Sequence, residues 1–329
     1  MNIYFDSTMN DRERRRRLAA GDVFIFSPRP STTKLTEHAR QLIEDAFAPL
    51  EPQQAQHSLP LEKFIEIVGP LKPRFIHHPT TQKLVLELLA DFGSELEQTY
   101  FDVPRMRVAT SDNYLNAGVA YVLHPHRDIW YSSPPCQLNW WLPVFPFEAE
   151  SSFAFHPHYW TTPVANSSNE YNHYEWNLGG RAQAASQTKV DTRKQPKATV
   201  PLQLEPEVRL VCKPGGLILF SGAHLHSTVA NTSGRSRFSI DFRTAHHDEL
   251  KGQWGVPKAP TGRAPARPCS SCGGPAISIL CLRSSSGFTI PIRRPIAKGS
   301  CTNRQRRACR KARRISLTTA LSRQSTAAG

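Results

Sequence analysis

The feature that most constrains the fold is a pair of histidine-bearing segments that lie far apart in the chain. His126-Arg127-Asp128 is followed, 98 residues after the aspartate, by His226. Both segments are rich in aromatic and branched residues, which favour an extended backbone. Two imidazoles and one carboxylate are ligands that Fe(II) prefers, and three such ligands leave half of an octahedral shell open. If these side chains bind one metal ion, the fold has to bring two distant strands together.

The first segment, residues 119–130, is predicted to be a strand or the end of one. Because side chains alternate along a strand, His126 and Asp128 then project in the same direction and can bind one metal ion. His124 lies on this face as well. Arg127 points to the other face, where we expect a structural role.

The second segment, residues 215–243, has a Gly-Gly turn, an apolar strand, a polar loop and another strand. His226 is expected at the end of the first strand, and Arg237 at the start of the next. A guanidinium there can bind a carboxylate through two hydrogen bonds, which implies an acidic co-substrate. His224 lies equally far ahead of Arg235, so spacing alone does not choose between the two histidines.

Together these residues resemble the Fe(II)- and 2-oxoglutarate-dependent dioxygenases, and among them the phytanoyl-CoA dioxygenase-like family, over residues 20–245. The resemblance implies a mainly β fold with flanking helices (α+β), in which a double-stranded β-helix, also called a jelly roll or cupin-like barrel, is buttressed by N-terminal helices. It implies the cofactor Fe(II), with 2-oxoglutarate and O2 as co-substrates, and hydroxylation with release of succinate and CO2. By position it assigns the iron ligands His126, Asp128 and His226, and the 2-oxoglutarate-binding residues Arg237 and, assisting it, Thr228.

Phe220 and Asn231 fit the family's pattern around His226, which favours His226 over His224 as the ligand. A site of three histidines, with His124 in place of the aspartate, would instead be typical of a cupin metal site. Asp128 favours the dioxygenase interpretation. It also argues against related halogenating enzymes, which replace this carboxylate with a small residue.

Residues 134–147 are predicted to form another strand, with Gln137, Asn139 and Trp141 on one face and Leu138, Trp140 and Leu142 on the other. In the resembling family this strand lines the co-substrate pocket, so Asn139 or Trp141 is expected to contact 2-oxoglutarate or the substrate. Simple core packing of the tryptophans is the alternative. His156 and His158 are interpreted as residues outside the ligand set or on the surface.

Apolar spacing predicts helices over Thr36–Leu50 and Thr81–Phe92, within an N-terminal helical region of about residues 10–95. The arginines of residues 12–17 are interpreted as a solvated helix face. The β core is placed at about residues 100–245. Within it, the polar stretch 161–205 is an inserted loop in which Tyr171, Tyr174 and Trp176 are candidates for contacting an organic substrate.

Charge divides the chain into a body, residues 1–250, and a tail, residues 251–329. The tail holds 16 Lys and Arg and no Asp or Glu, which leaves 25 basic against 27 acidic residues in the body. The net charge of +14 therefore describes the tail, and the body is not expected to bind nucleic acid.

The tail's composition predicts disorder or a shifted reading frame. Cys269 and Cys272 resemble half of a zinc site, but no suitably spaced second pair follows. A genuine basic appendage would instead bind nucleic acid or anionic membrane through residues 304–314.

We expect a cytoplasmic protein, because the body has only Cys136 and Cys212 and no apolar run long enough to span a bilayer. The expected partner is a small-molecule substrate. The sequence gives no prediction of the oligomeric state. Two alternatives to the oxygenase stay open. One is a non-catalytic cupin-like protein that binds a metal or small molecule, and the other is a nucleic-acid-binding protein that acts through its tail.

Overall fold

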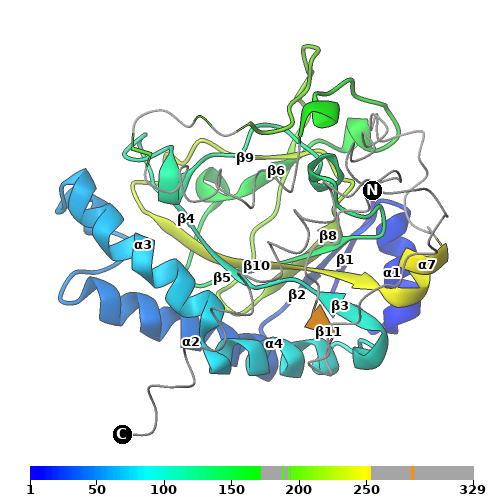
Figure 1. Cartoon of the computed structure of the whole chain (residues 1–329), viewed down its shortest axis with the longest axis horizontal. Coiled ribbons are helices and arrows are strands. Elements are labelled where there is room, and N and C mark those ends of the chain that lie inside the picture. Colours follow the sequence, from blue (N-terminus) through cyan, green and yellow to red (C-terminus); the bar gives the residue numbers. More distant parts are fainter. Residues whose placement is uncertain (172–186, 189–191, 193, 253–282, 285–329) are drawn as a thin grey trace, which may run out of the picture. The chain divides into compact units, whose positions relative to one another are not determined.

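The computed structural model describes residues 1–171, 187–188, 192, 194–252 and 283–284, in which helices flank a large β-sheet (Figure 1). The α-helices are α1 (Asp11–Ala19), α2 (Pro30–Phe47), α3 (Leu61–His77), α4 (Pro79–Asp91) and α7 (His247–Gly252). The strands are β1 (Ile3–Phe5), β2 (Val23–Phe26), β3 (Thr99–Phe101), β4 (Arg105–Ala109), β5 (Leu138–Pro143), β6 (Phe153–Phe155), β7 (Val208–Arg209), β8 (Leu217–Ser221), β9 (His226–Thr228), β10 (Arg237–His246) and β11 (Arg283–Ser284).

The large sheet is organised around β10, its longest strand. The strand order is β1-β2-β8-β5-β10-β3-β11, and β4 pairs with β10 along the same edge as β3. Only β1 and β2 run parallel, and the other pairs are antiparallel. The register places Arg243 opposite Asn139 and Asp241 opposite Trp141. These four residues therefore lie next to one another at the middle of the sheet.

A smaller sheet has the order β7-β6-β9, with Phe155 opposite His226. An isolated antiparallel bridge pairs His226 with His126 as well. The chain segment that carries the first histidine is thereby attached to β9. This bridge is where the two segments identified in the sequence meet.

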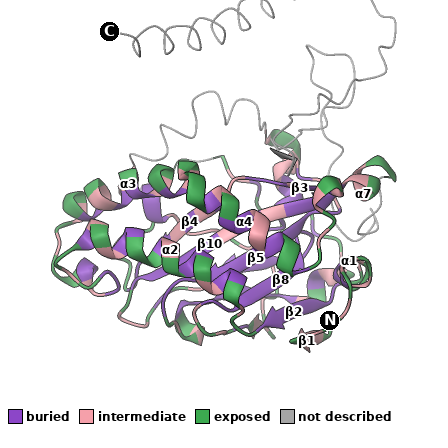
Figure 2. Cartoon of the chain, turned by 90° about the horizontal axis from the view of Figure 1, so that it is seen from below, coloured by how far each residue is buried: buried purple, intermediate pink, exposed green. Residues whose placement is uncertain are grey.

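The two faces of the large sheet pack against different partners because side chains alternate along each strand. Trp140 and Leu142 belong to the apolar core that includes the buried faces of α2, α3 and α4. Trp141 points the other way and packs with Phe153 and Phe155 of the small sheet. Figure 2 shows the three helices across one face of the sheet, with their buried residues turned toward it. The opposite face of the large sheet therefore borders the space between the two sheets.

The prediction of a mixed fold with a mainly β core and N-terminal helices is confirmed. The side-chain alternation predicted for residues 134–147 is confirmed in β5, because Trp140 and Trp141 lie in different apolar cores. In the part of the chain that the structure describes, the strands form two sheets and do not close into a barrel.

Helix α2 begins at Pro30, and the predicted start at Thr36 was wrong. Thr36 is inside the helix, where its hydroxyl donates to the carbonyls of Thr32 and Thr33. The start is instead fixed by Pro30 at the first helical position and by the Thr32 hydroxyl, which accepts from the Arg29 amide. A threonine that bonds back to its own helix resembles a cap in the sequence.

The arginine run does form a helix, α1, but the interpretation of a solvated face was wrong for two of its arginines. Arg14 is buried and donates to the Phe92 carbonyl and to Asp11. Arg15 pairs with Asp11 and with Glu249 of α7. These contacts join α1 to the end of α4 and to α7, so the run stabilises the fold.

Residues 119–130 are not a strand, contrary to the prediction. They contain two short 3-10 helices, Gly118–Ala120 and Asp128–Tyr131, and His126 makes only the isolated bridge. Pro125 has no amide hydrogen to offer a ladder, which is consistent with this irregular backbone. His226 likewise does not end the preceding strand. It begins β9 after a turn that follows β8.

The tail is described only in part. Residues 251–252 end α7, and 283–284 form β11, which pairs with β3. The rest of the tail, including Cys269 and Cys272, lies outside the described residues, as do Tyr174 and Trp176 of the inserted loop.

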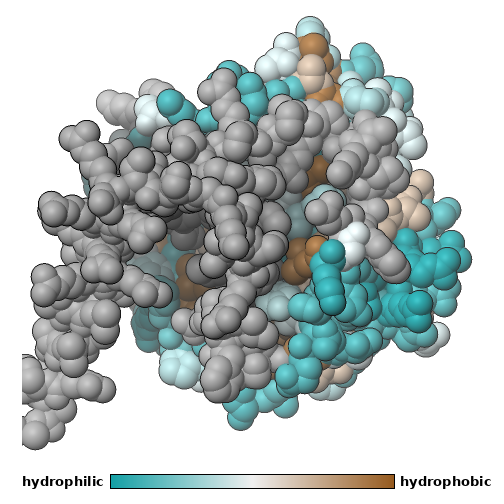
Figure 3. All heavy atoms as spheres, turned by 45° about the vertical axis from the view of Figure 1, so that its right-hand side comes forward, coloured by the Kyte–Doolittle hydropathy of each residue, from teal (hydrophilic) through white to brown (hydrophobic). Residues whose placement is uncertain are grey.

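Surface properties of the described chain agree with its composition. On the face drawn in Figure 3, hydrophilic side chains cover most of the described surface and apolar ones show only in small areas. None of the described helices is both long and apolar enough to traverse a bilayer.

Candidate metal centre

The two histidines face each other across the bridge between their segments. The His126 amide donates to the His226 carbonyl at 2.9 Å, and the reverse bond is 3.0 Å long. Directly opposed residues of an antiparallel pair carry their side chains on the same side. The imidazole centroids accordingly lie 4.4 Å apart. The backbone pairing alone thus brings together two potential ligands that are distant in the sequence.

Both imidazoles are oriented by a carbonyl two residues earlier in the chain. Nδ1 of His126 lies 2.7 Å from the His124 carbonyl, and Nδ1 of His226 lies 3.0 Å from that of His224. A carbonyl only accepts, so each Nδ1 carries the hydrogen in the neutral ring. The Nε2 atoms therefore keep their lone pairs for a metal ion, which is the usual arrangement of metal-binding histidines.

Asp128 completes the group, although by a different backbone than expected. It begins a 3-10 helix, which is held by the bond from the Ile129 amide to the Gly222 carbonyl. Its Oδ1 lies 3.2 Å from Nε2 of His126 and 3.9 Å from Nε2 of His226. The three donor atoms lie within 4.8 Å of one another, and all three residues are buried. Adjacent ligands at about 2.1 Å from an octahedral ion lie about 3 Å apart, so small shifts would let them bind one ion.

The protonation states also suit a metal ion. Burial by itself would raise the pKa of Asp128, but the adjacent His126 imidazole and the charge of Arg243 outweigh it and hold this pKa well below its ordinary value. Burial, with the neighbouring His126, lowers the pKa of His226 to about 4. At neutral pH the site therefore offers a carboxylate and an unprotonated imidazole from these two residues, which is what metal ligation needs.

The competing histidines lie elsewhere. His224 is fully buried against Trp160, with ring centroids 4.5 Å apart, and burial lowers its pKa to about 3. His124 is exposed, and its ring lines a groove outside the ligand group. Neither belongs to the clustered ligands, for which the structure brings together His126, Asp128 and His226.

A cavity of about 110 Å³ adjoins the three ligands, and Arg237 lines it from the start of β10. One of its terminal nitrogens donates to the Ser151 carbonyl at 2.8 Å, whereas its Nε is buried and has no hydrogen-bond partner among the described residues. Its guanidinium carbon lies 5.5 Å from the centre of the Trp141 ring. Burial lowers the pKa of Arg237 to about 10, which still leaves it charged at neutral pH. A buried cation with an unsatisfied donor favours an anion in this cavity.

Thr228 and Trp141 line the same cavity. The Thr228 hydroxyl accepts from the Leu123 amide at 3.1 Å, which leaves its own hydrogen available to another acceptor. Trp141 also packs against Phe147 and Phe153, as core packing requires. Its contact with a bound molecule stays a prediction.

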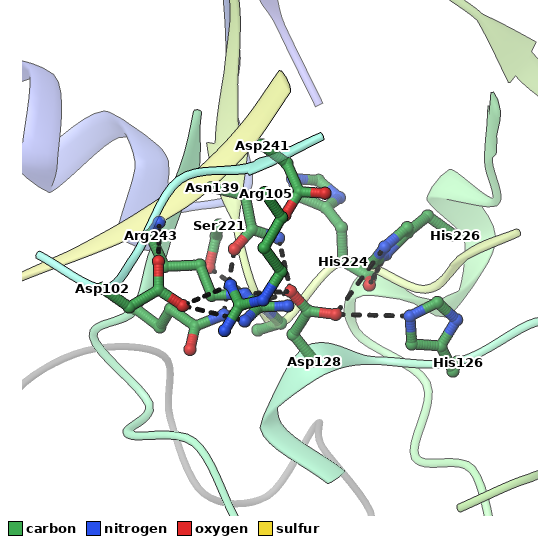
Figure 4. A network of polar contacts seen from close by, with 12 residues as sticks. Asp102, Arg105, His126, Asp128, Asn139, Ser221, His224, His226, Asp241 and Arg243 are labelled. Atoms are coloured by element: carbon green, nitrogen blue, oxygen red, sulfur yellow. Dashed lines mark hydrogen bonds and ion pairs between the residues drawn. The ribbon is translucent and has the colours of Figure 1, made fainter. Parts of the chain in front are cut away.

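Asn139 also lines the cavity, but its amide is directed toward Asp128 (Figure 4). Its Nδ2 donates to Oδ2 of Asp128 at 2.8 Å, and Gln137 donates to the same oxygen at 3.1 Å. Arg243 Nε lies 3.6 Å from that oxygen, and its Nη1 donates to Asp102 at 3.0 Å. A layer of polar residues thus surrounds the carboxylate on the side away from the histidines.

The roles of Gln137 and Arg243 were not recognised in the sequence, although the alternation of strand side chains could have revealed Arg243. Residues two apart in a strand share a face, so placing Arg237 at the site also places Asp241 and Arg243 there. All three do line the cavity. Asp241 is in turn paired with Arg107 of β4, which also contacts the Tyr121 hydroxyl.

Two buried residues next to the ligands have structural partners. Arg127 is fully buried and donates to the carbonyls of Ala223, Tyr159 and Thr162, in agreement with the structural role expected for it. His156 is buried and contacts the Ser227 hydroxyl at 3.0 Å. His158 is exposed.

A groove of about 1260 Å³ opens beside the cavity, and Ala109 and Thr228 line both. Tyr171 of the inserted loop lies in this groove, with its ring 5.2 Å from that of Tyr131. The Tyr131 ring in turn lies 5.5 Å from His126. A molecule bound in the groove would therefore lie close to the ligand group.

Comparisons with known proteins gave only structural likenesses. No profile of a known protein family matches the chain, and no curated protein matches its sequence. Among solved structures, the non-heme alpha ketoglutarate dependent epimerase SnoN from nogalamycin biosynthesis matches at 16% identity over 72% of this chain and 84% of its own, with a TM-score of 0.35. EvdO2 from Micromonospora carbonacea var. aurantiaca, complexed with 2-oxoglutarate, matches at 15% identity over 74% and 94%, with a TM-score of 0.41. The carbocyclase SnoK matches at 12% over 73% and 85%, with a TM-score of 0.36. Likenesses of this degree assign neither a fold nor a function to the chain.

Proposed function

We propose that the chain is a non-haem Fe(II)- and 2-oxoglutarate-dependent oxygenase of the phytanoyl-CoA dioxygenase-like type, which hydroxylates a small to medium organic substrate and releases succinate and CO2. The observation that carries the proposal is the convergence of two imidazole nitrogens and one carboxylate oxygen in a buried site. This donor set suits ferrous iron and leaves coordination positions for a co-substrate and O2. When bound, iron with 2-oxoglutarate would supply the oxidising chemistry.

Arg237 is the residue proposed to bind the distal carboxylate of 2-oxoglutarate. Its unsatisfied Nε is buried, and it lines the cavity that the ligands also line. Thr228 would donate its hydroxyl hydrogen to the same carboxylate.

The substrate is proposed to bind in the adjoining groove, beside Tyr171 and Tyr131. The groove is the larger of the two spaces and meets the cavity of the ligands at Thr228 and Ala109. The chain's own residues would hold the reactants in place, and the buried setting of the ligands would keep water away from them. The double-stranded β-helix is part of the same proposal, with the two sheets as its walls.

Further expectations follow from composition and environment. A cytoplasmic location suits the two free body cysteines, Cys136 and Cys212, and ferrous iron. A small molecule is the proposed partner, and nucleic acid is not expected to bind to the nearly neutral body.

The test is succinate formation by wild type and Asp128→Ala, with Fe(II), 2-oxoglutarate and O2, across a panel of organic compounds. Wild type should form succinate, and a true substrate should increase the yield, whereas Asp128→Ala should form no more than a blank without protein. Wild type that binds Fe(II) but forms no succinate with any compound would contradict the proposal and favour a non-catalytic metal-binding protein.

A further inference from the structure

The two oxygens of the Asp128 carboxylate have different surroundings. Oδ1 faces the imidazoles, at 3.2 Å and 3.9 Å from their Nε2 atoms. Oδ2 faces away from them and accepts hydrogen bonds from Asn139 and Gln137. A carboxylate whose second oxygen is already bonded is expected to bind a metal ion through one oxygen. This difference is fixed by residues outside the ligand group.

Asn139 is the nearest donor to Oδ2 and is itself held in one orientation. Its Nδ2 lies 2.8 Å from Oδ2, while its own Oδ1 accepts from Gln137 Nε2 at 2.9 Å. Gln137 therefore contacts both the carboxylate and the amide beside it. Both amide residues are buried, at 6% and 2% exposure. The bond from Gln137 determines which end of the Asn139 amide points at Asp128.

The packing around the amides leaves little freedom for another arrangement. A methyl group on Gly222 would come within 3.0 Å of Gln137 Nε2 and 3.4 Å of the Asp128 Cβ. The Gly222 carbonyl also accepts the hydrogen bond from the Ile129 amide, which holds the 3-10 helix that begins at Asp128. The carboxylate and the two amides are thus in direct contact in a closely packed place.

Arg243 contributes charge to the same oxygen but is held mainly by Asp102. It lies 3.6 Å from Oδ2, beyond hydrogen-bond distance, whereas its Nη1 lies 3.0 Å from Asp102 Oδ2 and its amide donates to Asp102 Oδ1 at 2.8 Å. Arg105 pairs with Asp102 too. The direct hydrogen bonds to Asp128 therefore come from the amides.

We propose that Asn139, oriented by Gln137, is a positioning residue that holds Asp128 so that it binds the metal ion through Oδ1 alone. The inference rests on the proposed metal site and assigns Asn139 a role different from the 2-oxoglutarate contact expected from the sequence. A carboxylate that uses one oxygen occupies one coordination position, so an additional position stays open for the reactants. Outer partners of this kind typically contribute about 10- to 100-fold to metal affinity.

The experiment measures the affinity for Co(II) alone, without 2-oxoglutarate, and the visible absorption of the bound ion. Asn139→Leu removes the donor and keeps the branched side-chain shape with the same number of non-hydrogen atoms. It should weaken Co(II) binding by about 10- to 100-fold and change the absorption, because a freed carboxylate alters the coordination number. Gln137→Leu should act in the same direction with a smaller effect, since Asn139 would keep its own bond to Oδ2.

Arg237→Gln is the matched control, because it lines the same cavity without touching Asp128. It should bind Co(II) within about threefold of wild type and lose affinity for 2-oxoglutarate instead. Asn139→Ser, which keeps a donor on a shorter side chain, should bind Co(II) better than Asn139→Leu but more weakly than wild type. It also provides the test if the leucine variant does not fold, as judged by its thermal unfolding.

The outcomes separate this inference from the proposed function. Wild type that binds no Co(II) would contradict both. Suppose that wild type binds Co(II), and that Asn139→Leu or Asn139→Ser keeps the Co(II) affinity but loses affinity for 2-oxoglutarate. This result would overturn the positioning role and restore the direct contact of Asn139 with 2-oxoglutarate. Equal Co(II) affinities of the folded serine and leucine variants would also contradict the role of the donor.

Discussion

Replacing Arg127 with methionine should destabilise the protein strongly, although this residue lies between two metal ligands and is not one itself. The side chain is fully buried and has no carboxylate partner. Its guanidinium instead donates to three backbone carbonyls, those of Ala223, Tyr159 and Thr162. These carbonyls belong to the turn before β9 and to the segment that follows β6. Arg127 therefore joins the segment of the first ligands to two loops that lie next to the paired strands β6 and β9.

The magnitude follows from two opposing contributions. Hydrogen bonds from a charged donor contribute about 1.5 to 3 kcal/mol each, or roughly 5 to 9 kcal/mol for three. Burial opposes this by lowering the pKa of Arg127 from its ordinary value to about 10, which corresponds to about 3 kcal/mol against the charged form. The net stabilisation is on the order of 2 to 6 kcal/mol, and Arg127→Met should lower the free energy of unfolding by about that amount.

Urea unfolding followed by circular dichroism, with a chelator present, measures this change without a contribution from bound metal. Arg40→Met is the control, because Arg40 is half exposed, pairs with Glu44 one turn away and otherwise lies over the Phe145 ring, which a methionine side chain can still contact. The control should change the free energy of unfolding by less than about 1 kcal/mol. An Arg127→Met protein as stable as the control would refute the reasoning that the three carbonyls depend on this arginine.

Three further outcomes are expected. Burial lowers the pKa of His224 from 6.5 to about 3, so its neutral form contributes stability that is present above pH 6.5 and lost as pH falls toward 3. The free energy of unfolding of His224→Leu should accordingly fall less steeply than that of wild type between pH 6.5 and 4, and parallel curves would count against this. Arg237→Gln should raise the 2-oxoglutarate concentration needed for half-saturation by about 10- to 100-fold, measured by calorimetry on the metal-loaded protein, and an unchanged value would exclude Arg237 as the anion site. Removal of residues 253–329 should leave Co(II) affinity within about threefold of wild type, because the described part of that region, β11, pairs with β3 and not with the strand that carries a ligand. A larger loss would show that the tail supports the site.

The sequence was sufficient to predict the candidate ligands because their chemistry is local and specific. His126 and Asp128 stand two apart, and His226 is followed at a fixed interval by Arg237 in a strand with a clear alternation. The structure places all four around one cavity. The alternation also predicted correctly that Trp140 and Trp141 lie in different cores.

The backbone around the ligands could not be predicted in the same way. Residues 119–130 have the composition of a strand, yet they form turns, and His126 pairs with His226 through one bridge. That bridge depends on contacts between segments about a hundred residues apart, which local propensity does not contain. Asp128 reaches the site from a 3-10 helix. His126, Asp128 and His226 therefore come together through a different backbone geometry than the strand assumed in the sequence analysis.

The outer residues were missed for a related reason. Gln137 and Arg243 act through hydrogen bonds and charge on Asp128, and nothing in their own neighbourhood in the sequence distinguishes them. Helix α3 contains Pro70 and Pro73, which disfavour a helix locally, but its buried side of Phe64, Val68, Leu71 and Phe75 packs into the core. In both cases tertiary contacts decide what the local sequence leaves open.

The most direct test of the central claim is an anaerobic titration of Fe(II) and 2-oxoglutarate into the purified protein, followed by visible absorption. If His126, Asp128 and His226 bind iron and 2-oxoglutarate chelates it, a weak visible charge-transfer band should grow to saturation at one equivalent of iron. Asp128→Ala should not show the band. A wild-type protein that is folded and yet gives no band at saturating 2-oxoglutarate would contradict the assignment of this site.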